Sequence, residues 1–203
     1  MNLLTRSIHV LSALTLVAGL SLAQDKGGAQ QPDPEMDRMM KMWQEVATPG
    51  EPHKRLNALV GSWTTKSTAW MDPSTPMVST GTAELKWILG GRFLQQEVSG
   101  EMMGMPFSGI GFTGYDNYNM KYGSFWIDNS ATAMFTAEGG FDQTGKVLTM
   151  YGKMDEWMTG ERDKTVKYVT KIDGPDSFTF ELHDLSPGEN GTKTFEIVYT
   201  RKK

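Results

Sequence analysis

The chain has 203 residues, a formal net charge of −4 and no cysteine. The absence of cysteine excludes disulfide bonds and thiolate metal sites, so cysteine usage says nothing about the cellular compartment. A mildly acidic chain also argues against a nucleic-acid partner, because nucleic-acid-binding proteins carry a basic patch.

Residues 1–23 have the pattern of a secretory signal peptide. Arg6 supplies the positive start, residues 8–20 form a short apolar core, and Ser21-Leu22-Ala23 is a small-residue cleavage site. The apolar core is short for a membrane span, so we favour cleavage over an uncleaved anchor helix. We therefore expect an exported protein, periplasmic or extracellular, with no stable membrane insertion after cleavage.

Cleavage after residue 23 would remove Arg6 and change the net charge from −4 to −5. The remaining chain of about 180 residues fits one domain. Residues 24–33 are rich in glycine, glutamine, proline and charge, which predicts a disordered tether.

Residues 34–60 are predicted to form one or two short helices. The first begins after Asp33, which can cap it, with Pro34 at the first helical position, and it ends before Thr48. Its methionine-rich stretch, residues 36–43, is expected to pack on the body of the domain. The alternative is a soft docking surface for a partner.

The second helix is predicted over residues 51–60. His53 lies near its start, and we interpret this histidine as a surface or capping residue rather than as a ligand. The apolar side chains Leu56, Leu59 and Val60 would share one face of this helix.

From Gly61 onward, short segments with a period of two follow one another at intervals of about ten residues. Turn sequences such as Gly90-Gly91 separate them, and no helix-length pattern intervenes. Antiparallel strands that follow one another in this way favour a closed barrel, because closure removes exposed edges. The ten predicted strands cover residues 62–71, 78–89, 92–103, 107–115, 121–129, 131–141, 146–154, 164–172, 177–185 and 193–201.

The fold class is therefore mostly β, a single antiparallel up-and-down barrel over residues 61–203. Its closure predicts a contact between the first and last strands. The alternation places Trp63 and Arg201 on inward faces at the two ends of the barrel sequence. An arginine stacked on the indole would stabilise the barrel end by about 1–2 kcal/mol where water is excluded.

Gly61-Ser62-Trp63 after a short helix, with an arginine in the last strand, resembles the calycin pattern of lipocalins, fatty-acid-binding proteins and nitrobindins. A wider set of motifs consists of Pro49-Gly50-Glu51-Pro52-His53, Gly61-Ser62-Trp63, Leu89-Gly90-Gly91-Arg92-Phe93-Leu94 with Glu97, Gly114-Tyr115-Asp116-Asn117, Trp126-Ile127-Asp128 and Tyr199-Thr200-Arg201. This set resembles a bacterial family catalogued only as domain of unknown function 1579. The resemblance covers about residues 49–201 and implies a lipocalin-like barrel without an assigned activity.

A barrel of this size encloses either packed side chains or one small ligand. The expected lining is aromatic and thioether in character, and most of it would be plain core. Its members are Trp87, Phe93, Phe107, Tyr115, Trp126, Phe135, Met150, Tyr168, Phe180 and Tyr199.

Arg92, Gln95, Glu97 and Asp128 are the polar candidates near this lining. Glu97 and Gln95 share a face with Phe93, so either could bind a polar ligand group, with Arg92 at the barrel mouth. The other interpretation, which we favour, pairs Arg92 with a surface carboxylate and exposes Glu97 to solvent. Asp128 shares a face with Trp126, and it would be a buried carboxylate with a partner or a cap of the following turn.

No metal or cofactor is predicted. Beyond the signal peptide the chain has two histidines, His53 and His183, which do not make a zinc or haem site, and His183 alternates onto an expected solvent face. Motifs for hydrolytic nucleophiles and phosphate-binding loops are missing from the sequence.

Our first hypothesis is an exported barrel that binds a small, largely apolar molecule. The alternatives are an isomerase or hydrolase with Glu97 or Asp128 as base, and a non-catalytic interaction module with a filled barrel. The sequence makes no prediction of oligomeric state.

Overall fold

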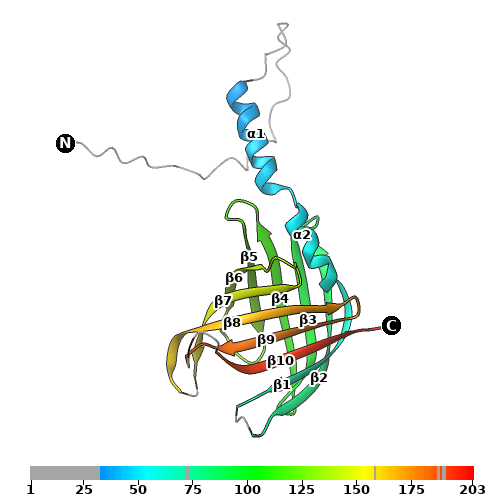
Figure 1. Ribbon diagram of the computed structural model, residues 1–203, viewed down its shortest axis with the longest axis vertical. Helices are drawn as coiled ribbons and strands as arrows, with labels where there is room; N and C mark the ends of the chain where they lie inside the picture. Colours follow the sequence, from blue (N-terminus) through cyan, green and yellow to red (C-terminus); the bar gives the residue numbers. More distant parts are fainter. Residues whose placement is uncertain (1–32, 72–73, 158, 187, 189–190) are drawn as a thin grey trace, which may run out of the picture.

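The structure, a computed structural model, describes residues 33–71, 74–157, 159–186, 188 and 191–203. The predicted signal peptide, and all of the predicted tether except residue 33, lie outside these residues. The described chain begins with α1 (Pro34–Ala47), α2 (Glu51–Arg55) and the 3₁₀ helix η1 (Leu56–Leu59). Ten strands follow (Figure 1): β1 (Gly61–Ala69), β2 (Met77–Ile88), β3 (Phe93–Met102), β4 (Met105–Asp116), β5 (Lys121–Asp128), β6 (Phe135–Phe141), β7 (Val147–Glu156), β8 (Glu161–Gly174), β9 (Ser177–Asp184) and β10 (Thr192–Arg201).

The ten strands form a closed antiparallel barrel in which each strand pairs with its neighbours in the chain. The last strand, β10, pairs with β1, which closes the barrel. This confirms the predicted up-and-down barrel and agrees with the expected lipocalin-like architecture. The main difference is at β6, which begins at Phe135, four residues after the predicted start.

Closure brings Trp63 and Arg201 directly opposite each other, as predicted. The Arg201 guanidinium carbon lies 4.1 Å from the centre of the Trp63 ring. Arg201 also donates hydrogen bonds to the backbone oxygens of Val60 and Pro175, both at 2.9 Å. The indole N–H of Trp63 donates to the Leu59 oxygen at 3.0 Å, so this pair connects the sheet to η1.

One end of the barrel is covered by α2 and η1 (Figure 1). Leu56 and Leu59 of η1 are 0% and 6% exposed and belong to the core together with Trp63. The Tyr122 hydroxyl of β5 donates to the Pro52 oxygen of α2 at 2.7 Å. Among the described residues, no helix lies across the opposite end, where the β3–β4 and β7–β8 hairpins turn. We call these the helix-covered end and the open end.

His53 is a capping residue, as expected, but it is not on the surface. Its Nδ1 accepts the Gly50 backbone N–H at 3.1 Å, and only 4% of the residue is exposed. Its ring meets Tyr115 edge-on, with 5.8 Å between the ring centres. Burial, the largest influence, lowers the pKa of His53 below its usual value.

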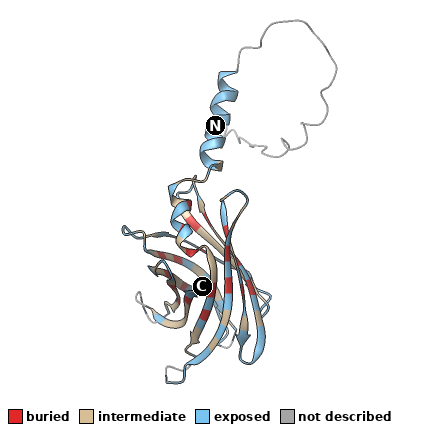
Figure 2. Cartoon of the chain, turned by 90° about the vertical axis from the view of Figure 1, so that its right-hand side faces the viewer, coloured by how far each residue is buried: buried red, intermediate tan, exposed pale blue. Residues whose placement is uncertain are grey.

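The expectation that α1 packs on the barrel is wrong. The cap at Asp33 and the predicted ends of the helix are confirmed, but none of its residues is buried (Figure 2). Its contact with the barrel includes hydrogen bonds from the Asn117 side chain to the backbone oxygens of Glu45, Val46 and Thr48. The apolar side chains of α1 therefore remain at the surface, including Trp43, which is 62% exposed.

No helix in the described part of the chain is both long and apolar enough to span a membrane.

Candidate functional site

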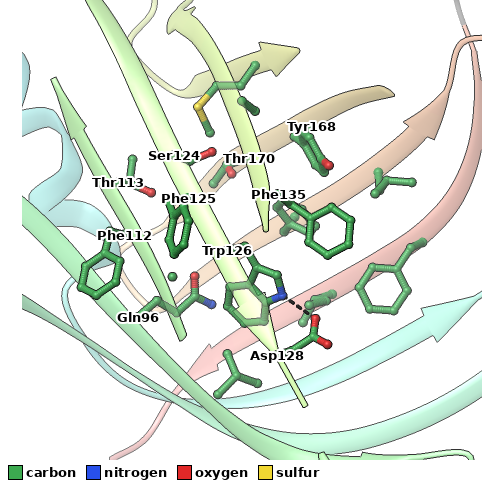
Figure 3. Close-up of a pocket in the computed structure, with 18 of the residues that line it drawn as sticks. Gln96, Phe112, Thr113, Ser124, Phe125, Trp126, Asp128, Phe135, Tyr168 and Thr170 are labelled. Atoms are coloured by element: carbon green, nitrogen blue, oxygen red, sulfur yellow. Dashed lines mark hydrogen bonds between the residues drawn. The ribbon is translucent and has the colours of Figure 1, made fainter. Parts of the chain in front are cut away.

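The barrel encloses a cavity of about 330 Å³ that reaches from Leu59 at the helix-covered end to Met102 and Ser130 at the open end. Its wall is mainly aliphatic, aromatic and thioether, which is the usual character of a small-molecule site. Figure 3 shows the aromatic and polar side chains that converge on it. The apolar lining includes Leu85, Leu94, Val98, Phe107, Trp126, Phe135, Ala137, Leu148, Met150, Met154, Tyr168, Phe178, Phe180, Leu182, Phe195, Ile197 and Tyr199.

Trp126 lies on β5 against two glycines of the neighbouring strand. A Cβ added at Gly109 would be 2.2 Å from the Trp126 ring, and one added at Gly111 would be 2.8 Å from it. Glycines at these two inward positions of β4 therefore leave the space that the indole occupies. A larger residue at either position would displace the ring from the cavity wall.

Asp128 ends β5 on the same face as Trp126, and it lines the cavity at the open end. Its Oδ2 accepts the indole N–H of Trp126 at 2.7 Å, drawn as the dashed line in Figure 3. Its Oδ1 accepts the backbone N–H and the hydroxyl of Ser130, at 2.9 and 2.5 Å. Asp128 caps the following turn, as one expectation had it. It also has a partner, the Trp126 indole, but it is half-buried rather than buried.

A few polar groups interrupt the apolar wall. Gln96 on β3 donates from its side-chain amide to the Tyr199 hydroxyl at 2.9 Å. Burial raises the pKa of Tyr199 to about 12, so this phenol is neutral at physiological pH. Burial also raises the pKa of Tyr168. The side chains of Thr170 and Ser124 complete the polar part of the lining labelled in Figure 3, together with Thr113.

One predicted lining residue, Phe93, and two polar candidates, Gln95 and Glu97, lie on the outer face of β3. Phe93 is 42% exposed and its ring covers Gly114 on the adjacent strand. Gln95 donates to Glu97 at 2.6 Å, and Glu97 pairs with Lys86 at 3.1 Å on the barrel surface. The placement of Phe93 inside the barrel is therefore corrected, and Glu97 has the solvent-facing position that we favoured.

The inward residues of β3 are instead Leu94, Gln96 and Val98. Leu94 and Val98 are 2% and 8% exposed, and all three line the cavity. Sequence reasoning missed Gln96, because the aromatic ring of Phe93 was taken to mark the inner face. The signal that could have found it is the Leu94–Val98 pair, two aliphatic residues four apart on one strand face.

Three other candidates lie near the helix-covered end and outside the cavity lining. Trp87 donates its indole N–H to Asn57 of η1 at 2.8 Å, and Tyr115 packs on His53. Arg92 donates to the Leu89 oxygen at 3.0 Å within the β2–β3 turn, which is far from the open end. Arg92 therefore does not lie at the open mouth of the barrel. The carboxylate pairing that we favoured is also wrong, since no carboxylate among the described residues forms an ion pair with Arg92. Asp128 is the one polar candidate that lines the cavity. The predicted lining residues that the structure brings to it are Phe107, Trp126, Phe135, Met150, Tyr168, Phe180 and Tyr199.

The outer face carries a charged cluster around Glu181 on β9. Glu181 is only 7% exposed, and it contacts Lys171 at 2.7 Å and His183 at 2.9 Å. Burial is the largest single influence on the pKa of Glu181 and raises it. The hydrogen bonds to Lys171 and His183 lower this pKa, and the net shift is downward. In the described residues, no group of three or more histidine, aspartate or glutamate side chains is placed to hold a metal ion.

A family model described as "Protein of unknown function (DUF1579)" matches residues 48–201. No curated protein matches the chain. The crystal structure of Rv2717c from M. tuberculosis is similar at a TM-score of 0.56 and 17% identity, covering 77% of this chain and 100% of that one. A redesigned beta barrel is also similar, at a TM-score of 0.40 and 15% identity over 73% of this chain and 96% of that one. At these identities, the comparison with Rv2717c shows the shared fold alone.

Proposed function

Because this chain belongs to the DUF1579 family, whose function is unknown, we propose a function from the site itself: the barrel binds a small, largely apolar molecule in its cavity. The observation that carries the proposal is an apolar cavity of about 330 Å³ that reaches the open end of the barrel. This volume lies within the usual range of ligand sites, about 300–1,000 Å³. A filled barrel, as the interaction-module hypothesis requires, does not fit such a volume.

Side chains of the cavity wall contact one another, which favours binding without large rearrangement. Phe178 and Tyr199 stack with 4.0 Å between their ring centres, and the Trp126 indole N–H donates to Asp128. A preformed apolar site lowers the entropy cost of binding.

The catalytic alternative has less support. Glu97 is hydrogen-bonded to Gln95 on the outer face and does not line the cavity. Asp128 does line it, but the described lining includes no histidine, lysine or cysteine that could act with it as a second acid–base group. We therefore assign Asp128 a role in ligand binding rather than in catalysis.

The binding proposal is tested by filling the cavity. Ser124→Phe adds a ring to a cavity-lining position, and Ser99→Phe adds the same ring to an exposed position on β3. Calorimetry with 1-octanol as probe should show binding to the wild type and to Ser99→Phe. Ser124→Phe should bind at least about tenfold more weakly, because the ring competes for the same volume. Equal affinity in both variants, with thermal melting showing that both are folded, would contradict the proposal.

Export is part of the proposed function and rests on the first 23 residues of the sequence. We expect the protein expressed in a Gram-negative host to appear in the periplasmic fraction. Mass spectrometry should find Gln24 as its first residue. A protein retained in the cytoplasm with residues 1–23 intact would argue against export.

A further inference from the structure

The cavity wall has an uneven distribution of charge. Asp128 is its one carboxylate, and the described residues that line the cavity include no lysine, arginine or histidine. No ion pair with a lysine or arginine is formed by Asp128 among the described residues, although it accepts hydrogen bonds from Trp126 and Ser130. A negative group beside an apolar space therefore has neutral partners only, and a charge in such a place is stabilised by an opposite charge.

Two cations whose side chains alternate toward the barrel interior, Lys164 and Arg201, already have partners. Lys164 of β8 shares a face with Val166, and its ammonium lies 2.7 Å from Asp184 and 3.3 Å from Glu161. Arg201 lies at the helix-covered end, where it stacks on Trp63 and donates to backbone oxygens. Neither cation lines the cavity, so an anionic ligand would find the carboxylate of Asp128 without a compensating positive group.

From this arrangement we propose, building on the proposed function, that the ligand is a cationic amphiphile: an ammonium group bound at Asp128 and an apolar chain extending into the barrel. The carboxylate has about four lone-pair sites, and three hydrogen bonds from Trp126 and Ser130 occupy three of them. One site remains for an ammonium donor.

The position of Asp128 sets the orientation of the ligand. It is the last residue of β5, at the open end, whereas Leu59 and Leu85 line the cavity toward the helix-covered end. A bound amphiphile therefore keeps its charged group near solvent and buries its chain. This arrangement avoids the cost of carrying a charge to the middle of the barrel.

Three probes with the same eight-carbon chain test the proposal by calorimetry at pH 7: octylamine, 1-octanol and octanoate. An aliphatic amine is protonated at this pH. We expect octylamine to bind about tenfold more tightly than 1-octanol, as a hydrogen bond to a charged group predicts, and octanoate to bind most weakly. Equal binding of all three would overturn this inference and leave the proposed function intact. Binding of none would overturn both.

Asp128→Asn removes the charge and retains the shape of the side chain, and Glu97→Gln removes one carboxylate from the outer face as a matched control. The preference for octylamine over 1-octanol should fall to about twofold or less in D128N and persist in E97Q. A preference that persists in D128N would overturn the inference.

A measurement on the wild type is independent of how D128N folds. Octylamine should shift the NMR signal of the Trp126 indole N–H, which donates to Asp128, and the variant Trp126→Phe identifies that signal. Tight amine binding without a shift of this signal would place the ammonium elsewhere and overturn the inference.

Discussion

The two ends of the barrel differ in how their side chains are used. At the helix-covered end, Trp63 is fully buried between Arg201, Phe178 and η1. At the open end, Met134 is 74% exposed and Trp157 85% exposed. Turns at the helix-covered end also expose apolar side chains, such as Tyr118 at 79%, so the two ends differ in the buried cluster around Trp63, where the first and last strands meet. The other end can then remain accessible to a ligand at little cost in stability.

The largest effect should come from removing the indole at the helix-covered end. Trp63→Ala removes a fully buried ring and its hydrogen bond to Leu59. We expect the free energy of unfolding to fall by about 3–5 kcal/mol, measured by urea denaturation. Trp157→Ala at the open end should change it by less than about 0.5 kcal/mol. Similar losses in the two variants would contradict the division between the ends.

A smaller effect is expected at the cavity wall. Gly109→Ala places a methyl group 2.2 Å from the Trp126 ring, whereas a Cβ at Gly123 on β5 meets nothing within 4 Å. We expect Gly109→Ala to lower the free energy of unfolding by about 1–3 kcal/mol and to weaken 1-octanol binding. Gly123→Ala should leave both unchanged. If the two alanine variants behave alike in denaturation and calorimetry, the position of the Trp126 ring does not require a glycine at position 109.

The smallest effect concerns pH and His53. Burial lowers the pKa of His53 in the folded protein relative to about 6.5 in the unfolded chain. The unfolded state therefore takes up the proton first as the pH falls. The stabilisation from neutral His53 is complete above about pH 6.5 and is lost as the pH falls through the lowered folded-state pKa.

His53→Asn removes this titration and keeps an acceptor for the Gly50 N–H. Urea denaturation from about pH 8 down to about pH 5 should show a smaller loss of stability in the variant than in the wild type. An unchanged pH dependence would mean that His53 is not the responsible group.

Much of the fold could be predicted because its signals are local. The alternation of β1 and β10 placed Trp63 and Arg201 on inner faces, and pairing of these strands makes them neighbours. The start of α1 could be predicted because the Asp33 cap and Pro34 act within one turn. The same local information says nothing about what the apolar face of α1 contacts.

The candidate site was predicted less completely. Trp126 and Asp128 were expected on one face of β5, and the structure places both at the cavity. On β3, each face carries apolar and polar residues, so alternation alone does not identify the inner one. The register does: Gln96 lies opposite the buried Leu85, whereas Glu97 lies opposite Glu84 at the surface.

The sequence by itself determined the order of the strands, the turns between them and the residues that close the barrel, since these follow from alternation and turn chemistry along the chain. Only the tertiary structure decided which end is covered, which face of β3 points inward and that one carboxylate borders an apolar cavity. The physical reason is that these features depend on strands distant in the chain, whose side chains meet only after the sheet has closed.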